Sequence, residues 1–233
     1  EEEFQSLNLG QKVYYHTLGQ PQSDDKLIYE DPEHPEYGFM ASVTEDGRYL
    51  VLTNWVGTDD RYRILYRDLK SDDESIKILI DKFENEYSLI GNEGSKLYFK
   101  SDLNPPKKCI LTIDVGAEHV GAEHVVIPES EESMESASIV GDHLVLSYLK
   151  DAKSQVKVFD LAGNFIREVN LPGIGTARGF AGRRDHSETF YSFSSFNRPP
   201  SSYRYDLKTG DSELVRTAKV DFNPDDFEVN QVF

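Results

Sequence analysis

Tyr66-Arg67-Asp68-Leu69 is the first of four short segments that decide the fold of this chain. The other three are Thr112-Ile113-Asp114-Val115, Val158-Phe159-Asp160-Leu161 and Tyr205-Asp206-Leu207. Each is a strand-like run that ends in an aspartate followed by an aliphatic residue. Successive aspartates are 46 residues apart (114 − 68, 160 − 114 and 206 − 160). One such run has no diagnostic value, but four in constant register indicate an internal repeat.

Each repeat carries the signals of four strands. A tight turn is predicted about twenty residues before each aspartate, at 46–47, 93–94, 141–142 and 184–185. Gly beside Asn or Asp supplies the positive φ that a two-residue hairpin turn needs. A strand-like run follows each turn (49–52, 96–99, 143–146 and 189–193), and an outer strand follows each aspartate (76–80, 125–127, 165–169 and 213–217).

Four antiparallel strands at this period are typical of a β-propeller blade, whereas helical repeats would show apolar residues at three- and four-residue spacing. We therefore expect an all-β chain with blades at about 39–82, 87–128, 134–172 and 176–217. Two further runs, Lys12–His16 and Lys26–Glu30, predict half of a preceding blade within 11–33, and residues 218–233 form an exit segment. An open arc of blades would leave sheet faces uncovered, so upstream residues are expected to complete the ring.

Composition restricts the partners of the chain. Its formal net charge of −17 disfavours nucleic acid and anionic membranes, since both repel an acidic surface. No run of eighteen apolar residues is present, so no membrane span is expected. The single cysteine, Cys109, lies in a strand pattern and is predicted to be a buried structural thiol. The chain shows no leader sequence and no disulfide pair, so we expect a cytoplasmic location, or a periplasmic or secreted one if a signal peptide lies upstream.

No catalytic, metal or cofactor site is predicted within the chain. Ser194 and Ser195 precede a Pro-rich turn and lack the Gly-x-Ser-x-Gly elbow that exposes a nucleophile, so we expect local hydrogen bonds to the backbone, even with His186 nearby. His119 and His124 sit in a duplicated loop without clear third and fourth metal ligands. The acidic runs 71–74 and 129–132 are expected to be solvated blade connections, and Gly-rich 172–175 precedes no helix that would bind phosphate.

Several segments resemble one family. Residues 44–50 resemble the "DDGRY" hairpin of prolyl oligopeptidases, and residues 92–100 resemble the next blade of that family. The most specific match is 190–200, Phe-Tyr-Ser-Phe-Ser-Ser-Phe-Asn-Arg-Pro-Pro, which is similar to the family's last-blade motif. Gln231-Val232-Phe233 resembles the point where the family's chain leaves the propeller for its hydrolase domain.

The resemblance implies a two-domain serine peptidase that cleaves after proline. A seven-bladed propeller would cover an α/β-hydrolase domain of the same protein, and this chain would supply half of blade three and blades four to seven. The Ser-His-Asp triad would then lie beyond Phe233. Short proline-containing peptides are the implied substrates, and the propeller would admit them while excluding folded proteins by size.

The resemblance also implies which loops face the peptidase. If the first strand of each blade starts at that face, the loop with Trp55, Gly57 and Thr58 faces the substrate, and the loop with Phe196, Asn197 and Arg198 faces the hydrolase domain. Characterised members carry an Arg and a Cys beside the substrate at the positions of Trp55 and Thr58. This chain departs from that pattern, which puts thiol sensitivity and an arginine contact in doubt. Trp55 is either a pocket residue or an aromatic that packs within the blade.

Two functions of different classes follow. The first is the gating propeller of a proline-specific serine oligopeptidase, and the alternative is a stand-alone propeller that acts as a protein-interaction scaffold. A reading frame that continues into a Gly-x-Ser-x-Gly elbow would favour the enzyme, and a stop codon after Phe233 would favour the scaffold. A macrocyclising parent with the same architecture remains open, because that chemistry is decided in the hydrolase domain.

Overall fold

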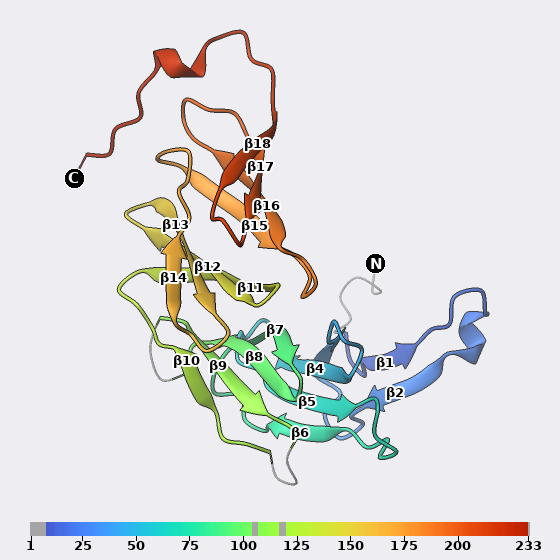
Figure 1. The fold of residues 1–233 in the computed structure, drawn as a ribbon. Helices are drawn as coiled ribbons and strands as arrows, with labels where there is room; N and C mark the ends of the chain where they lie inside the picture. The colour runs from blue at the N-terminus through green and yellow to red at the C-terminus, as the bar shows by residue number, and fades with distance from the viewer. Residues whose placement is uncertain (1–7, 104–106, 117–119, 233) are drawn as a thin grey trace. The chain divides into compact units, whose positions relative to one another are not determined.

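A computed structural model describes residues 8–103, 107–116 and 120–232 of the chain. Its regular structure is almost all β, with five antiparallel sheets in the described residues. The chain divides into two compact units, Glu1–Ser88 and Leu89–Phe233. Figure 1 shows the strands of each sheet following one another in chain order.

The first unit contains a two-stranded and a four-stranded sheet. The two-stranded sheet pairs β1 (Lys12–Tyr15) with β2 (Lys26–Glu30), and the four-stranded sheet runs in the order β3 (Tyr37–Val43), β4 (Tyr49–Val56), β5 (Arg63–Asp68) and β6 (Lys77–Ile80). Leu50, Leu52 and Leu65 form a buried cluster on the larger sheet. Val13, Ile28 and Tyr29 of the smaller sheet pack against it, so apolar burial joins the two sheets.

The second unit contains three four-stranded sheets. Their strands are β7 (Tyr87–Glu93, beginning in the first unit), β8 (Lys96–Ser101), β9 (Cys109–Asp114) and β10 (His124–Ile127); β11 (Ser133–Val140), β12 (His143–Lys150), β13 (Lys153–Asp160) and β14 (Phe165–Glu168); β15 (Thr176–Ala181), β16 (Glu188–Ser194), β17 (Ser201–Asp206) and β18 (Ser212–Thr217). Every sheet is a meander. Four full sheets and one half sheet confirm the predicted all-β architecture of four-stranded blades.

Buried side chains fill the space between successive sheets of the second unit. One cluster joins Tyr98 and Ile110 of the β7–β10 sheet to Leu144 and Leu146 of the β11–β14 sheet. A second cluster joins Val145 and Val158 to residues of the β15–β18 sheet, among them Phe180, Tyr191 and Phe193. A sheet with both faces apolar must be covered twice, and face-to-face packing of neighbouring sheets does so.

A β-bulge at Phe180 shapes the contact between the last two sheets. Phe180 is buried with φ +61°, a left-handed conformation that is uncommon for a residue with a side chain. Its ring stacks on Tyr191 with centroids 4.6 Å apart, and the Ser138 hydroxyl donates to its carbonyl oxygen at 2.6 Å. Aromatic stacking and a hydrogen bond from the neighbouring sheet thus hold a backbone conformation that the sequence pattern did not predict.

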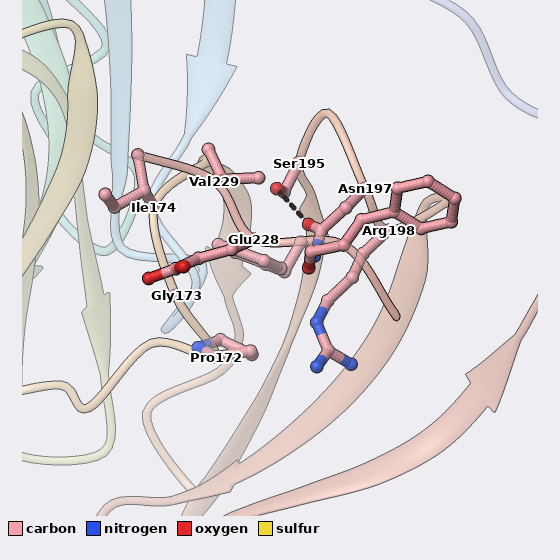
Figure 2. A pocket seen from close by; sticks show the side chains of 10 residues that line it. Pro172, Gly173, Ile174, Ser195, Asn197, Arg198, Glu228 and Val229 are labelled. Atoms are coloured by element: carbon pink, nitrogen blue, oxygen red, sulfur yellow. Dashed lines mark hydrogen bonds between the residues drawn. The ribbon is translucent and has the colours of Figure 1, made fainter. Parts of the chain in front are cut away.

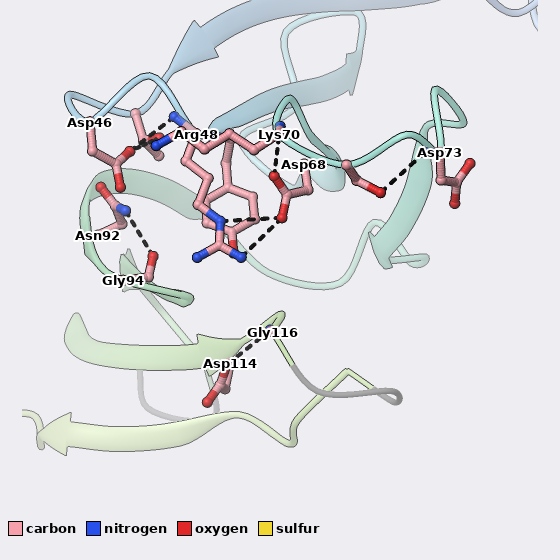
Figure 3. A network of polar contacts seen from close by, with 12 residues as sticks. Asp46, Arg48, Asp68, Lys70, Asp73, Asn92, Gly94, Asp114 and Gly116 are labelled. Atoms are coloured by element: carbon pink, nitrogen blue, oxygen red, sulfur yellow. Dashed lines mark hydrogen bonds and ion pairs between the residues drawn. The ribbon is translucent and has the colours of Figure 1, made fainter.

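The four repeat aspartates occupy equivalent positions. Strands β5, β9, β13 and β17 end at Asp68, Asp114, Asp160 and Asp206, as the 46-residue spacing predicts. Each carboxylate accepts a hydrogen bond from a backbone N–H of the turn that follows, from Lys70, Gly116, Asn164 and Lys208 at 2.7–3.0 Å. Figure 3 shows this bond at Asp68 and at Asp114. The repeat signature is therefore a structural turn motif, since an Asp side chain substitutes for a backbone acceptor in such turns.

A tight turn lies at, or within one residue of, each of the four predicted positions, and two of the turns are two-residue connections. Gly94 (φ +57°) begins the connection to β8, and Gly141 (φ +54°) begins the connection to β12, each followed by one residue before the strand. The other two turns lie within longer connections: the Gly47 N–H donates to the Thr44 carbonyl at 2.8 Å, and the His186 N–H donates to the Arg183 carbonyl at 3.1 Å. Residues 45–48 form a longer loop, because the Asp46 carboxylate accepts from the Thr44 hydroxyl at 2.7 Å and the Arg48 N–H at 3.1 Å. Residues 182–187 separate β15 from β16.

Cys109 confirms its predicted structural role. The side chain is 1% exposed, and burial raises the pKa of the thiol. A buried, protonated thiol is a poor nucleophile, so the residue acts as a small apolar side chain. None of the helices in the described residues is long and apolar enough to span a membrane.

Candidate functional site

Trp55 lies at the end of β4 and packs within its own sheet. Its cross-strand partner on β3 is Gly38, and the half-buried indole occupies the space that a side chain at Gly38 would fill. A Cβ built on Gly38 would lie only 2.4 Å from Cε2 of Trp55. This placement favours the packing interpretation of Trp55.

The loop after Trp55 is held by its own hydrogen bonds. Gly57 (φ +59°) and Thr58 are exposed, and the Asp59 N–H closes the turn on the Val56 carbonyl at 3.2 Å. The Asp59 carboxylate accepts from the Arg61 guanidinium, with Nε to Oδ1 at 2.8 Å, and from the Arg61 N–H at 3.0 Å. The Arg61 side chain, then its backbone N–H, lowers the pKa of Asp59 to about 2. Sequence reasoning missed Arg61, although its spacing from Asp59 was a signal.

The second predicted loop connects β16 to β17 in the second unit. Ser195 and Arg198 close it with reciprocal backbone hydrogen bonds of 3.1 and 3.3 Å, which leaves Phe196 at the tip, fully exposed. The Asn197 side chain turns inward, where Oδ1 accepts from the Ser195 hydroxyl at 2.8 Å. Ser195 therefore bonds to a neighbouring side chain, and the expectation of a backbone partner is wrong for this residue. Across the described residues, the structure shows no serine hydroxyl bonded to a histidine.

Asn197 and Arg198 also contact the exit segment. The Asn197 amide Nδ2 donates to the Phe227 carbonyl at 2.8 Å and to the Pro224 carbonyl at 3.2 Å. The Arg198 guanidinium pairs with Asp225 at 2.5 Å. The family resemblance predicts that this loop faces a neighbouring domain. It did not indicate these partners, because no sequence pattern in residues 218–232 points to a contact with the loop.

A hollow of about 190 Å³ lies beside this loop. Figure 2 shows its walls, made by residues 172–174 on one side, the β16–β17 loop on another and residues 227–229 of the exit segment. A second, more open hollow of about 370 Å³ is bordered by Phe196, Phe222 and Phe227, and it extends the apolar surface of the loop. Ser195, Asn197 and Arg198 already have hydrogen-bond or ion-pair partners, so the arrangement favours contact with another surface over chemistry.

The acidic runs are engaged in ion pairs more than the sequence suggested. The hydroxyl and N–H of Ser75, then the Lys77 ammonium 3.1 Å away, lower the pKa of Asp73 to about 2. Glu132 lies 3.1 Å from Lys150 and 3.8 Å from Lys157, and the Lys150 hydrogen bond is the main cause that lowers the pKa of Glu132.

Over residues 8–103, 107–116 and 120–232, no three His, Cys, Asp or Glu side chains gather in a way that could hold a metal ion. His119 lies outside the described residues, and His124 is exposed on β10.

Comparison with known proteins decides the family. Residues 1–218 match the model of the prolyl oligopeptidase N-terminal β-propeller domain. This chain belongs to that family.

Relatives of the prolyl oligopeptidase propeller agree with this assignment. A prolyl endopeptidase of Elizabethkingia miricola is 36% identical over 95% of this chain and 31% of its own length. A dual function macrocyclase-peptidase of Galerina marginata is 28% identical over 94% of this chain and 31% of its own length. A solved structure from a study of two prolyl endopeptidases superimposes with a TM-score of 0.87 at 35% identity, covering 94% of this chain and 32% of that one. The chain thus spans about a third of the length of these relatives.

Proposed function

We propose that this chain is the gating propeller of a proline-specific serine oligopeptidase. The single observation that carries the proposal is the match to the propeller model over residues 1–218, since the matched relatives are named as prolyl endopeptidases. The Ser-His-Asp site would belong to an α/β-hydrolase domain of the same protein. Short proline-containing peptides would reach that site, and folded proteins would be excluded by their size, so specificity would be partly steric.

The surface around the exit segment supports a neighbouring hydrolase domain. Phe196 is fully exposed, and Phe222 and Phe227 are 47% and 57% exposed, with their rings 5.7 Å apart. Three exposed aromatic side chains around one hollow are unfavourable in water and suit a surface that another domain covers. These residues lie where the chain leaves its last sheet, so a following domain would meet them first.

The substrate-facing role of the Trp55 loop is part of the same proposal. Exposed Gly57 and Thr58 would contact peptide, while Trp55, packed on Gly38, would support the loop. The family resemblance implies a thiol and a guanidinium beside the substrate at this loop, and Thr58 and Trp55 occupy those positions here. The parent enzyme should therefore resist inhibition by thiol reagents acting at this loop.

A peptidase assay tests the proposal. The parent protein should release the fluorophore from a Gly-Pro amide and leave a folded, proline-containing protein intact, while the 233-residue chain alone should hydrolyse neither. Turnover by the isolated chain would overturn the assignment of the triad to another domain. A parent protein without post-proline activity, or with equal activity on folded protein, would overturn the gating role and favour the scaffold alternative.

The macrocyclase relative motivates one further measurement. Because that protein is named as both macrocyclase and peptidase, the products of a long proline-containing peptide should be weighed by mass spectrometry. Hydrolysis adds water to the products, whereas cyclisation yields a product lighter than the linear fragment by one water.

We also propose a cytoplasmic location, supported by the one buried, unpaired cysteine, and cell fractionation of the parent organism tests it.

A further inference from the structure

The exit segment crosses the loop edge of two neighbouring sheets. After β18 ends at Thr217, residues 218–232 pass the β16–β17 loop and then the β12–β13 turn. Within the segment, the Asn223 side chain accepts from the Asp225 N–H at 3.2 Å and caps the 3₁₀ turn Pro224–Asp226. Because Asn at the cap and Pro at the first helical position both favour such a turn, neighbouring residues in the sequence are enough to form it.

The first anchor of the segment is on the β15–β18 sheet. Asn197 uses all of its amide there, since Oδ1 accepts from Ser195 while Nδ2 donates to two carbonyls of the segment. The Ser195 hydroxyl thereby fixes which way the amide faces. Arg198 adds an ion pair with Asp225, but both side chains are well exposed, so this pair contributes little.

The second anchor is on the β11–β14 sheet. The Gln231 side chain donates to the carbonyl oxygen of Asp151. Asp151 and Ala152 form the two-residue turn between β12 and β13, both with positive φ (+49° and +58°). A turn of this type requires positive φ at both central residues, and non-glycine residues adopt it at some cost. The contact with Gln231 is one interaction that favours it.

We propose that residues 223–231 form a strap that ties the β11–β14 and β15–β18 sheets together along their loop edge, with Asn197 as its positioning residue. The strap would limit separation of the two sheets at this edge.

Hydrogen bonds, and not apolar burial, hold the strap. Neither Phe222 nor Phe227 is buried, and the described residues of the segment contribute no member of the buried clusters. Loss of the two Asn197 donors should therefore release the strap from its first anchor and leave the Gln231 hydrogen bond as its main tie. Two inter-sheet hydrogen bonds at the same edge report whether release also loosens the sheets: the Ser154 N–H donates to the Gly175 carbonyl at 3.0 Å, and the Ala177 N–H donates to the Ser154 hydroxyl at 3.0 Å.

The first experiment measures the mobility of the strap. Cys109 is the only cysteine and is buried, so a nitroxide attached through Val232→Cys labels one site, at a position that is 90% exposed. Asn197→Asp removes both donors and keeps an oxygen for Ser195. Asn230→Asp makes the same change of charge at an exposed residue of the same segment and serves as the control. We expect several-fold faster nitroxide motion in Asn197→Asp and no change in Asn230→Asp. Equal mobility in the two variants would overturn the role of Asn197.

The second experiment measures the tie between the sheets in the same 233-residue chain. In Asn197→Asp, the amides of Ser154 and Ala177 should exchange with deuterium faster, on the order of tenfold. A factor of this size corresponds to the net free energy of one or two hydrogen bonds. Asn230→Asp should leave them unchanged. If the nitroxide becomes mobile in Asn197→Asp while exchange at Ser154 and Ala177 is unchanged, Asn197 holds the segment but the segment does not tie the two sheets, and the strap would be rejected. Lack of labelling at Cys109 in each variant confirms that it is folded.

Discussion

At the residue scale, the repeat aspartates join local chemistry to the fold. Asp114 accepts from the Gly116 N–H at 3.0 Å, and this bond, followed by one from Ser95, lowers the pKa of the carboxyl below its usual value of 3.8. Similar turn bonds lower the pKa of Asp160 and Asp206. The turn after each third strand is therefore stabilised by an ionised carboxylate.

Asp114 gives a prediction for pH. A carboxyl whose pKa is depressed in the folded state stabilises the fold above its unfolded pKa, and that stabilisation is lost as the pH falls through the folded pKa. Asp114→Asn should be less stable than the parent at neutral pH, and the gap should close as the pH falls below 3.8. Asp114→Ala, which removes the acceptor, should lose about 1 kcal/mol at neutral pH. Urea unfolding across this range measures it, and a gap that stays constant with pH would contradict the ionic contribution.

Gly38 gives a prediction for packing. Gly38→Ala places a methyl group 2.4 Å from the Trp55 indole, so the ring or the strand must move. Overpacking of this kind costs about 1–3 kcal/mol. Trp55 is the only tryptophan, so its emission in urea reports the change directly. Gly173→Ala is the matched control, because a Cβ at that position would meet no atom within 4 Å and the φ of Gly173 is ordinary. Equal midpoints for the two variants would show that Trp55 does not pack on Gly38.

At the element scale, sequence predicted what local chemistry determines. The aspartate spacing located the ends of β5, β9, β13 and β17 to the residue, because the Asp turn depends on a few neighbouring groups. The length of the connection at 45–48 was not predicted, because Thr44 and Asp46 close it through their side chains. The Phe180 bulge and the Asn197 contacts depend on residues far away in the chain, so no local pattern indicates them.

The contact between the last two sheets gives a prediction at this scale. Ser154 is 8% exposed, and its hydroxyl accepts from the Ala177 N–H of the neighbouring sheet. Ser154→Ala leaves that N–H buried without this acceptor, which costs about 1–3 kcal/mol. Ser192→Ala, on the exposed side of β16, is the control and should be close to neutral. Thermal unfolding compares them, and a neutral Ser154→Ala would mean that the Ser154 hydroxyl does not help to hold these sheets together.

At the scale of the whole molecule, net charge opposes the compact state. The formal charge is −17, and most of the ion pairs described above lie at the surface, where each contributes little. Long-range repulsion among the excess carboxylates should therefore outweigh these short-range attractions. Salt screens repulsion strongly once the Debye length falls from about 30 Å at 0.01 M to about 8 Å at 0.15 M.

We expect the urea midpoint of the 233-residue chain to rise over this salt range. Sodium chloride serves as the salt, since sulfate would also strengthen apolar burial. Exposed pairs such as Lys77 with Asp73 weaken at the same time, so the measured change is the balance of the two effects. A rise means that repulsion dominates, as the excess of acidic residues predicts. A fall would mean that the ion pairs across the blade connections hold the sheets more strongly than exposed pairs usually do, and the acidic runs would then be structural elements of the fold.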